Sequence, residues 1–111
     1  MILIVRKKVD EGVREIVSED LGGYVKVVVD VRRKILAAGG EVHANGEKLL
    51  LEDGSKQADL WGGGIDFKAD EIDFDSTINA RGKQKNKSCE VLDKKIRRQM
   101  KNVINNLLGK A

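Results

Sequence analysis

A chain of 111 residues, 41% of them apolar and 35% charged, has the size and composition of one soluble globular domain, which excludes an intrinsically disordered protein. No apolar run approaches the roughly 20 residues that a membrane-spanning helix needs, and the apolar start of the chain precedes its first basic residues, the reverse of a secretory signal. We therefore expect a cytoplasmic protein. The single cysteine, Cys89, excludes an intramolecular disulfide and a cysteine-based zinc site within one chain.

The charge is distributed unevenly along the chain. Residues 1–80 carry 11 Lys or Arg and 16 Asp or Glu, a net charge of −5, whereas residues 81–111 carry 10 and 2, a net charge of +8. Acidic residues are densest in residues 39–80, where ten of them accompany three lysines. An acidic middle and a basic tail would suit an anionic partner at the tail, or self-association through opposite charges.

The first half of the chain is predicted to hold one strand and two helices. Residues 1–5 are aliphatic without alternation, which is typical of a buried strand, and Asp10 is a suitable N-cap for a helix that runs to about Ser18. Residues 20–38 are ambiguous, because valines alternate as in a strand while other apolar residues recur at helical spacing. A basic segment followed by two glycines is typical of a helix end, so a helix is the favoured interpretation of residues 20–38.

Three strands and a final helix are predicted in the second half. Two hydrophobic runs, residues 47–52 and 59–67, flank turn-forming residues and indicate a hairpin. Residues 71–79 have the period of two that favours a third strand. Residues 81–88 contain no apolar residue and are expected to form an exposed loop. A helix with one apolar stripe should begin after Asp93 and end at Gly109.

These elements predict a single globular α+β domain over residues 1–111. Their order is β-α-α-β-β-β-α, and an antiparallel sheet with its helices packed mainly on one face is the simplest arrangement. This order is similar to that of the compact ribonuclease toxins that cut messenger RNA. The likeness is one of topology only, and a fold does not imply a function.

The segment richest in polar chemistry, residues 39–64, contains the only histidine and the only tryptophan. Glu41 and His43 would point the same way in an extended segment, and a carboxylate beside a histidine suits proton transfer, so both are candidate catalytic residues. The alternative is that both are surface residues of a connection between a helix and a strand, without a role in catalysis.

Carboxylates of the predicted hairpin would suit a divalent cation. Glu52, Asp53 and Asp59 offer the oxygen ligands that Mg²⁺ prefers, and they are the residues that would bind a metal if one is used. Their spacing is unspecific, and solvent-facing acids are the structural alternative. No other cofactor is expected.

A second candidate site follows the third predicted strand. Asn79 and Arg81 would share a strand face, and arginine fits phosphate oxygens bidentately. Lysines at every second position in the next loop suit a polyanion. The candidate ligand-binding residues are Ser55, Trp61, Ser76, Asn79, Arg81, Lys83 and Lys85. The structural alternatives are that Ser55 caps a tight turn, that Trp61 packs in the core, and that the basic loop is solvated surface.

Several motifs carry a resemblance to a known family. The segment with GGE, His43, LLLEDGS, Gln57 and DLWG resembles an uncharacterised family of small prokaryotic proteins, and FDS, Ile78-Asn79, Arg81 and the helix that begins at Asp93 are similar to its C-terminal half. The resemblance covers nearly the whole chain. It implies a single domain with an important central segment, and it names no reaction. The chain departs from the family pattern at Gly82, where the pattern has proline.

The best-supported prediction is a binding domain for an anionic ligand, either a phosphorylated small molecule or a nucleic acid. The site would lie between His43, the hairpin turn and residues 76–81, with Arg81 and the lysines holding the ligand. One alternative is a small ribonuclease-toxin-like hydrolase that uses His43 as a base. Another is a self-associating interaction module that forms a homodimer.

Overall fold

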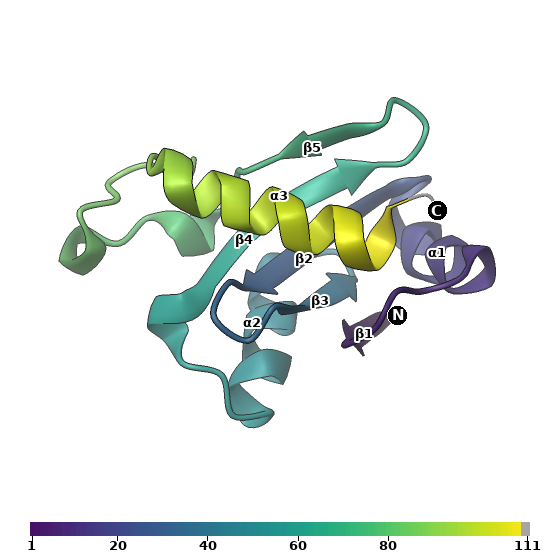
Figure 1. Ribbon diagram of the computed structural model, residues 1–111, viewed down its shortest axis with the longest axis horizontal. Coiled ribbons are helices and arrows are strands. Elements are labelled where there is room, and N and C mark those ends of the chain that lie inside the picture. Colours follow the sequence, from purple (N-terminus) through teal and green to yellow (C-terminus); the bar gives the residue numbers. More distant parts are fainter. Residues whose placement is uncertain (110–111) are drawn as a thin grey trace.

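The computed structural model describes residues 1–109, which form a five-stranded antiparallel sheet and three α-helices (Figure 1). The strands lie in the order β1-β3-β2-β4-β5. They are β1 (Ile2–Val5), β2 (Tyr24–Asp30), β3 (Ile35–Gly39), β4 (Leu60–Asp66) and β5 (Glu71–Asp73). The helices are α1 (Glu11–Ser18), α2 (His43–Glu52) and α3 (Lys94–Leu108). The predicted α+β class and antiparallel sheet are confirmed.

The sheet is covered on both faces. Val25, Val27 and Val29 of β2 belong to the apolar cluster that α1 and α3 build on one face. Val28 belongs to a smaller cluster, which Leu50 of α2 builds on the other face. Two of the three helices thus share a face, and α2 packs alone on the opposite one.

The helix predicted over residues 20–38 is wrong, because this segment forms the β2–β3 hairpin. β2 lies in the middle of the sheet and is buried on both faces. Apolar residues therefore occur at odd and at even positions, and some of them fall at helical spacing. The basic segment is the hairpin turn. Asp30 Oδ1 accepts hydrogen bonds from the main-chain N–H groups of Arg32 and Arg33, and Lys34 has a φ of 59°.

The strand predicted over residues 47–52 is also wrong, because these residues form the second half of α2. Helix α2 lies close to the sheet at Gly46, where an added Cβ would come within 3.1 Å of Val28 and 3.3 Å of Ala37. The apolar run of residues 49–51 is too short to separate a strand from a helix by periodicity. The turn after it therefore leads from α2 to β4.

The last predicted strand is shorter than expected. β5 ends at Asp73, and Thr77–Asn79 form a turn of 3₁₀ helix. β4 and β5 form an antiparallel hairpin, with Ile65 opposite Ile72.

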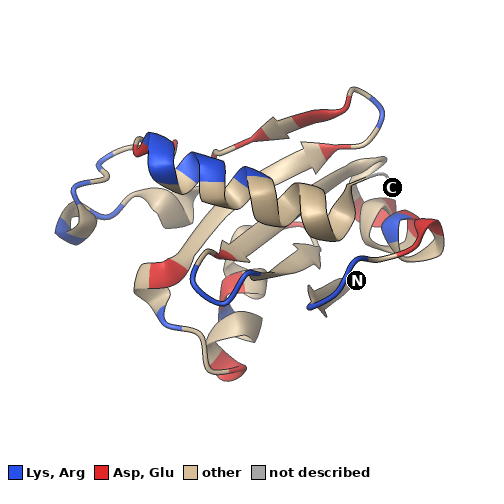
Figure 2. Cartoon of the chain, viewed as in Figure 1, with Lys and Arg blue, Asp and Glu red and all other residues tan. Residues whose placement is uncertain are grey.

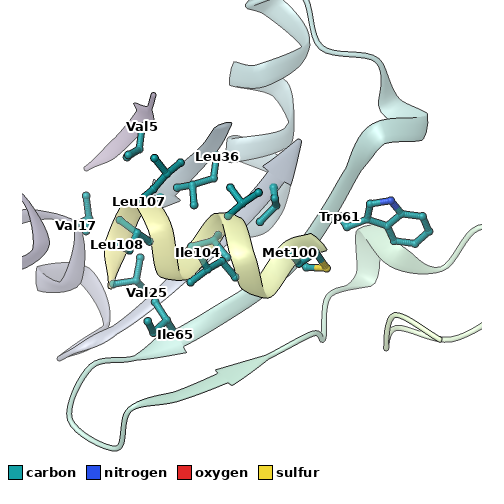
Figure 3. Packing of buried hydrophobic residues seen from close by; sticks show 14 of the residues in the cluster. Val5, Val17, Val25, Leu36, Trp61, Ile65, Met100, Ile104, Leu107 and Leu108 are labelled. Atoms are coloured by element: carbon teal, nitrogen blue, oxygen red, sulfur yellow. The ribbon is translucent and has the colours of Figure 1, made fainter. Parts of the chain in front are cut away.

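Helix α3 begins and ends as predicted and supplies much of the core. Asp93 caps its N-terminus by accepting a hydrogen bond from the N–H of Lys95, and Gly109 follows its last residue. Figure 3 shows its apolar stripe packed on the sheet, with Trp61 at one end of the cluster. The buried residues of the stripe are Met100, Val103, Ile104, Leu107 and Leu108. Among residues 1–109, no helix is long and apolar enough to cross a bilayer.

Candidate functional site

The turn between α2 and β4 is fixed by a partly buried polar network. Ser55 Oγ donates a hydrogen bond to Asp30 Oδ2 at 2.7 Å and accepts one from Arg33 Nη1 at 2.8 Å. Asp53 accepts from Arg6 Nη2 at 2.6 Å and from Arg33 Nη2 at 2.8 Å, and these hydrogen bonds lower the pKa of its carboxyl below the ordinary value. Ser55 is buried and its hydroxyl has partners on both sides. The network ties the end of α2 to the β2–β3 turn.

The carboxylates that would bind a metal are spread over this region. Asp53 pairs with two arginines, Asp59 pairs with Arg32 at 3.0 Å, and Glu52 is exposed. In the part of the chain that the structure describes, no group of three His, Cys, Asp or Glu side chains could hold a metal ion.

The side chain of Asn79 completes the sheet beyond the end of β5. Its Oδ1 accepts from the Gly62 N–H at 2.8 Å, and its Nδ2 donates to the Gly62 carbonyl at 2.9 Å. The amide thus takes the place of a neighbouring strand residue. Nδ2 also donates to the carbonyls of Phe74 at 3.3 Å and Cys89 at 3.0 Å, and Asn79 is fully buried. An added Cβ on Gly62 would lie 2.5 Å from Ser76 Cβ, so the glycine makes room for this turn.

The guanidinium of Arg81 is bound by main-chain carbonyls. Its Nε donates to Ile78 at 2.8 Å, its Nη1 donates to Gln57 at 2.8 Å, and its Nη2 donates to Leu60. The group also lies over the indole of Trp61, 4.5 Å from the ring centroid, and burial lowers its pKa from the ordinary value. Arg81 therefore anchors the start of the loop that follows it, and most of its donors are already engaged.

Sequence reasoning missed Asn86, which fixes the lysine loop (residues 82–88) from inside. Its Nδ2 donates to the carbonyls of Asn79, Ser88 and Glu90 at 2.8, 2.9 and 2.9 Å, and its Oδ1 accepts from the Leu92 N–H at 2.9 Å. Asn86 is 3% exposed. An asparagine between lysines gives no sequence signal of burial. Because of it, the lysines project from an anchored main chain.

The lysine loop and the first half of α3 are both rich in cations and lie at the same end of the molecule (Figure 2), and we call this region the basic end. In Figure 2 the blue loop lies beside the blue N-terminal half of α3. The exposed cations of the basic end are Lys83, Lys85, Lys87, Lys94, Lys95, Arg98 and Lys101. Two acids, Glu90 and Asp93, lie among them in the sequence, and Glu90 is 3.8 Å from the half-buried Arg97. Sequence reasoning did not single out the α3 cations as site residues, because their proximity to the loop depends on the fold.

His43 lies at the start of α2, in the layer on the other face of the sheet from α3. Its Nε2 is 2.6 Å from the Gly63 carbonyl, so Nε2 carries the proton and donates it. Burial lowers the pKa of the imidazole, which is therefore neutral at pH 7 with Nδ1 unprotonated. The positive charge of Lys26 also lowers this pKa, whereas the negative charge of Asp73 raises it. Glu41 is exposed and makes no hydrogen bond with the ring.

The predicted site residues thus fall into separate groups. Asn79, Arg81, Ser76 and Trp61 meet in one packed region beneath the lysine loop, whereas Ser55 belongs to the Arg33 network and His43 belongs to the α2 layer. Lys83 and Lys85 are exposed above the packed region. Among the predicted ligand-binding residues, these two lysines are the ones whose side chains are exposed, and they belong to the basic end.

Comparison with known proteins gives a family. The model of a family described as a protein of unknown function (DUF5674) matches residues 3–107. None of the curated proteins and none of the solved structures matches the chain. The match includes the buried networks and the basic end, and it confirms the resemblance to an uncharacterised family. The chain belongs to the DUF5674 family of proteins of unknown function.

Proposed function

We propose that this protein binds nucleic acid through the phosphates of the strand, at the basic end. The observation that carries the proposal is the set of seven exposed cations at one end of the molecule, on an anchored loop and the adjacent helix. Among residues 1–109, none of the seven takes part in an ion pair. Unpaired cations at this density attract a polyanion and release its counterions.

The position of the cations on α3 supports a role in binding, because it does not stabilise the helix. Lys94 and Lys95 lie in the first turn of the helix, and Arg98 follows in the next. The N-terminus of a helix already carries partial positive charge, so cations there destabilise the helix slightly. A bound phosphate strand would reverse that effect, because it places negative charge beside the N-terminus.

The extent of the surface favours a polymer over a single phosphate group. Lys94 and Lys101 are about 10 Å apart along the axis of α3, and the lysine loop extends the surface further. Arginine is suited to hold a single phosphate group in a bidentate way, but Arg81 donates to carbonyls inside the protein. Several phosphates of one strand fit the arrangement better.

The test is the binding of a fluorescein-labelled, unstructured 12-nucleotide RNA, followed by anisotropy between 50 and 300 mM NaCl. For about four phosphates contacted, the slope of log K against log salt should be about −3. The triple variant Lys94→Gln/Lys95→Gln/Arg98→Gln should lower the affinity at 50 mM NaCl at least tenfold and flatten the slope.

A matched control has the same change in net charge at other exposed positions. Lys7 and Lys8 lie at the opposite end of α3, where the Val9 N–H donates to the Leu107 carbonyl, and Lys48 lies on α2. The variant Lys7→Gln/Lys8→Gln/Lys48→Gln should change the affinity less than twofold. Equal losses in the two triple variants, or no binding by the wild-type protein at 50 mM NaCl, would contradict the proposal.

One observation favours a second candidate, the ribonuclease-like hydrolase. His43 has a neutral ring with an unprotonated Nδ1, and Lys26 lies near enough for its charge to lower the pKa of the ring. A base and a neighbouring cation are groups that RNA cleavage can use. Cleavage of the 12-nucleotide RNA by the wild-type protein, abolished in a folded His43→Ala variant, would support this candidate. Intact RNA after prolonged incubation would reject it.

A further inference from the structure

Resting on the proposed function, we propose that the basic end also binds a nucleobase of a single strand, in a hollow between the lysine loop and the start of α3. The hollow has a volume of about 410 Å³. Residues 84–86 of the loop line it together with Leu92, Asp93 and Ile96, and Trp61 also contributes to the lining. Its size falls in the range of small-ligand sites.

The hollow presents apolar surface in the middle of the cations. Leu92 is 55% exposed, and Ile96 beside it is partly exposed. A partner that brings both an apolar surface and negative charge would complement apolar side chains that lie beside exposed cations. A single-stranded nucleic acid has this combination, because flat bases alternate with phosphates. The base would pack on Leu92 and Ile96, and the flanking phosphates would reach Lys85 and Lys94.

The contact with Trp61 is restricted to its edge. The residue is 2% exposed, and the guanidinium of Arg81 covers one face of the ring. A base in the hollow would therefore approach the rim of the indole and would not stack on its full face. The proximity is still close enough to change the emission of the tryptophan.

The hollow offers few free hydrogen-bonding groups. Gln84 accepts from Arg81 and donates to the Ala58 carbonyl, the Asn86 side chain bonds to main-chain groups of residues 79, 88, 90 and 92, and Asp93 caps α3. The hollow therefore has few groups that could distinguish one base from another. The hollow should accept any base, so oligo(U) and oligo(A) of equal length should bind within about threefold of each other.

The experiment compares a ligand that has bases with one that lacks them. The wild-type protein is titrated at 50 mM NaCl with 12-nucleotide oligo(U) and with linear inorganic polyphosphate of similar length. Trp61 is the only tryptophan, so its emission reports on the hollow directly. Both ligands should bind, but only oligo(U) should change the emission.

A pair of leucine substitutions locates the effect. Leu92→Ala should lower the affinity for oligo(U) about fivefold and leave that for polyphosphate within twofold. Leu51→Ala, at a leucine that is 40% exposed on α2, is the matched control and should change neither affinity. Circular dichroism of both variants checks that they are folded.

The outcomes separate the two proposals. If oligo(U) binds with unchanged Trp61 emission and Leu92→Ala has no effect, the base site is overturned while phosphate binding at the basic end stands. If neither ligand binds the wild-type protein, the proposed function fails and the base site fails with it. A loss of polyphosphate affinity in Leu92→Ala equal to the loss for oligo(U) would also overturn the base site.

Discussion

The buried amide of Asn79 should be among the most sensitive positions in the fold. Asn79→Ala removes four hydrogen bonds from a fully buried side chain. The carbonyls of Phe74 and Cys89 keep other donors, since they also accept from the N–H groups of Val91 and Ser76. The N–H and carbonyl of Gly62 lose the amide that satisfies them.

Two buried main-chain groups would thus be left without the side-chain partner. Each such group costs about 1–3 kcal/mol, so the free energy of unfolding should fall by about 4 kcal/mol. That is a large part of the 5–15 kcal/mol typical of a small domain. With a urea dependence of about 2 kcal/mol per molar, the midpoint should fall by about 2 M. Asn79→Asp should cost more, because it places an oxygen against three carbonyl oxygens.

Urea denaturation followed by Trp61 fluorescence and by far-ultraviolet circular dichroism measures the loss. Asn102→Ala, at an exposed position on α3, is the control and should change the free energy of unfolding by less than about 0.5 kcal/mol. A cost below about 1 kcal/mol for Asn79→Ala would refute the assignment of this amide as the substitute for a strand.

Three further substitutions test other parts of the structure. Ser55→Ala removes the hydroxyl that donates to the buried Asp30 at 2.7 Å, and urea denaturation should show a loss of about 2 kcal/mol. Gly64→Ala would place a Cβ against the Tyr24 hydroxyl, so the protein should lose about 2 kcal/mol and melt several degrees lower by calorimetry. Because the pKa of His43 is lowered in the folded protein, the imidazole is protonated in the unfolded chain at a higher pH, about 6.5, than in the folded one. Stability should therefore decrease from pH 7 to pH 5, and His43→Gln should flatten this slope in urea titrations at each pH.

Each of these three has a result that counts against it. A neutral Ser55→Ala would show that Asp30 needs no donor there, and an unchanged melting temperature for Gly64→Ala would show that Tyr24 moves freely. Since His43 is the only histidine, a slope that survives its replacement would place the titrating group elsewhere.

The sequence was most informative where a helix lies on the surface of the core. α3 shows its cap, one apolar stripe and a glycine stop, because one face packs on the sheet and the other meets solvent. The same rules gave a wrong prediction for residues 20–38, because helices cover both faces of β2 and its apolar residues do not alternate with polar ones. A one-face pattern exists only for an element with one buried face.

The candidate site shows a second limit of sequence reasoning. Asn79, Arg81 and Ser55 have the side chains of a ligand site, but the fold gives them main-chain or buried side-chain partners. Nothing local distinguishes an amide that binds a ligand from one that substitutes for a strand, because the Gly62 groups it satisfies are 17 residues away. The excess of basic residues after residue 80 was visible, and the fold adds that loop and helix display it together.

The most direct test of the account is a ¹⁵N-NMR titration of the labelled protein with the 12-nucleotide RNA at 50 mM NaCl, followed by salt addition to 300 mM. The account predicts shifts of the amides of residues 83–101 and of the Trp61 indole N–H, and their reversal at 300 mM. Shifts centred on α2 around His43 and Lys48, or no shifts at 50 mM, would contradict it.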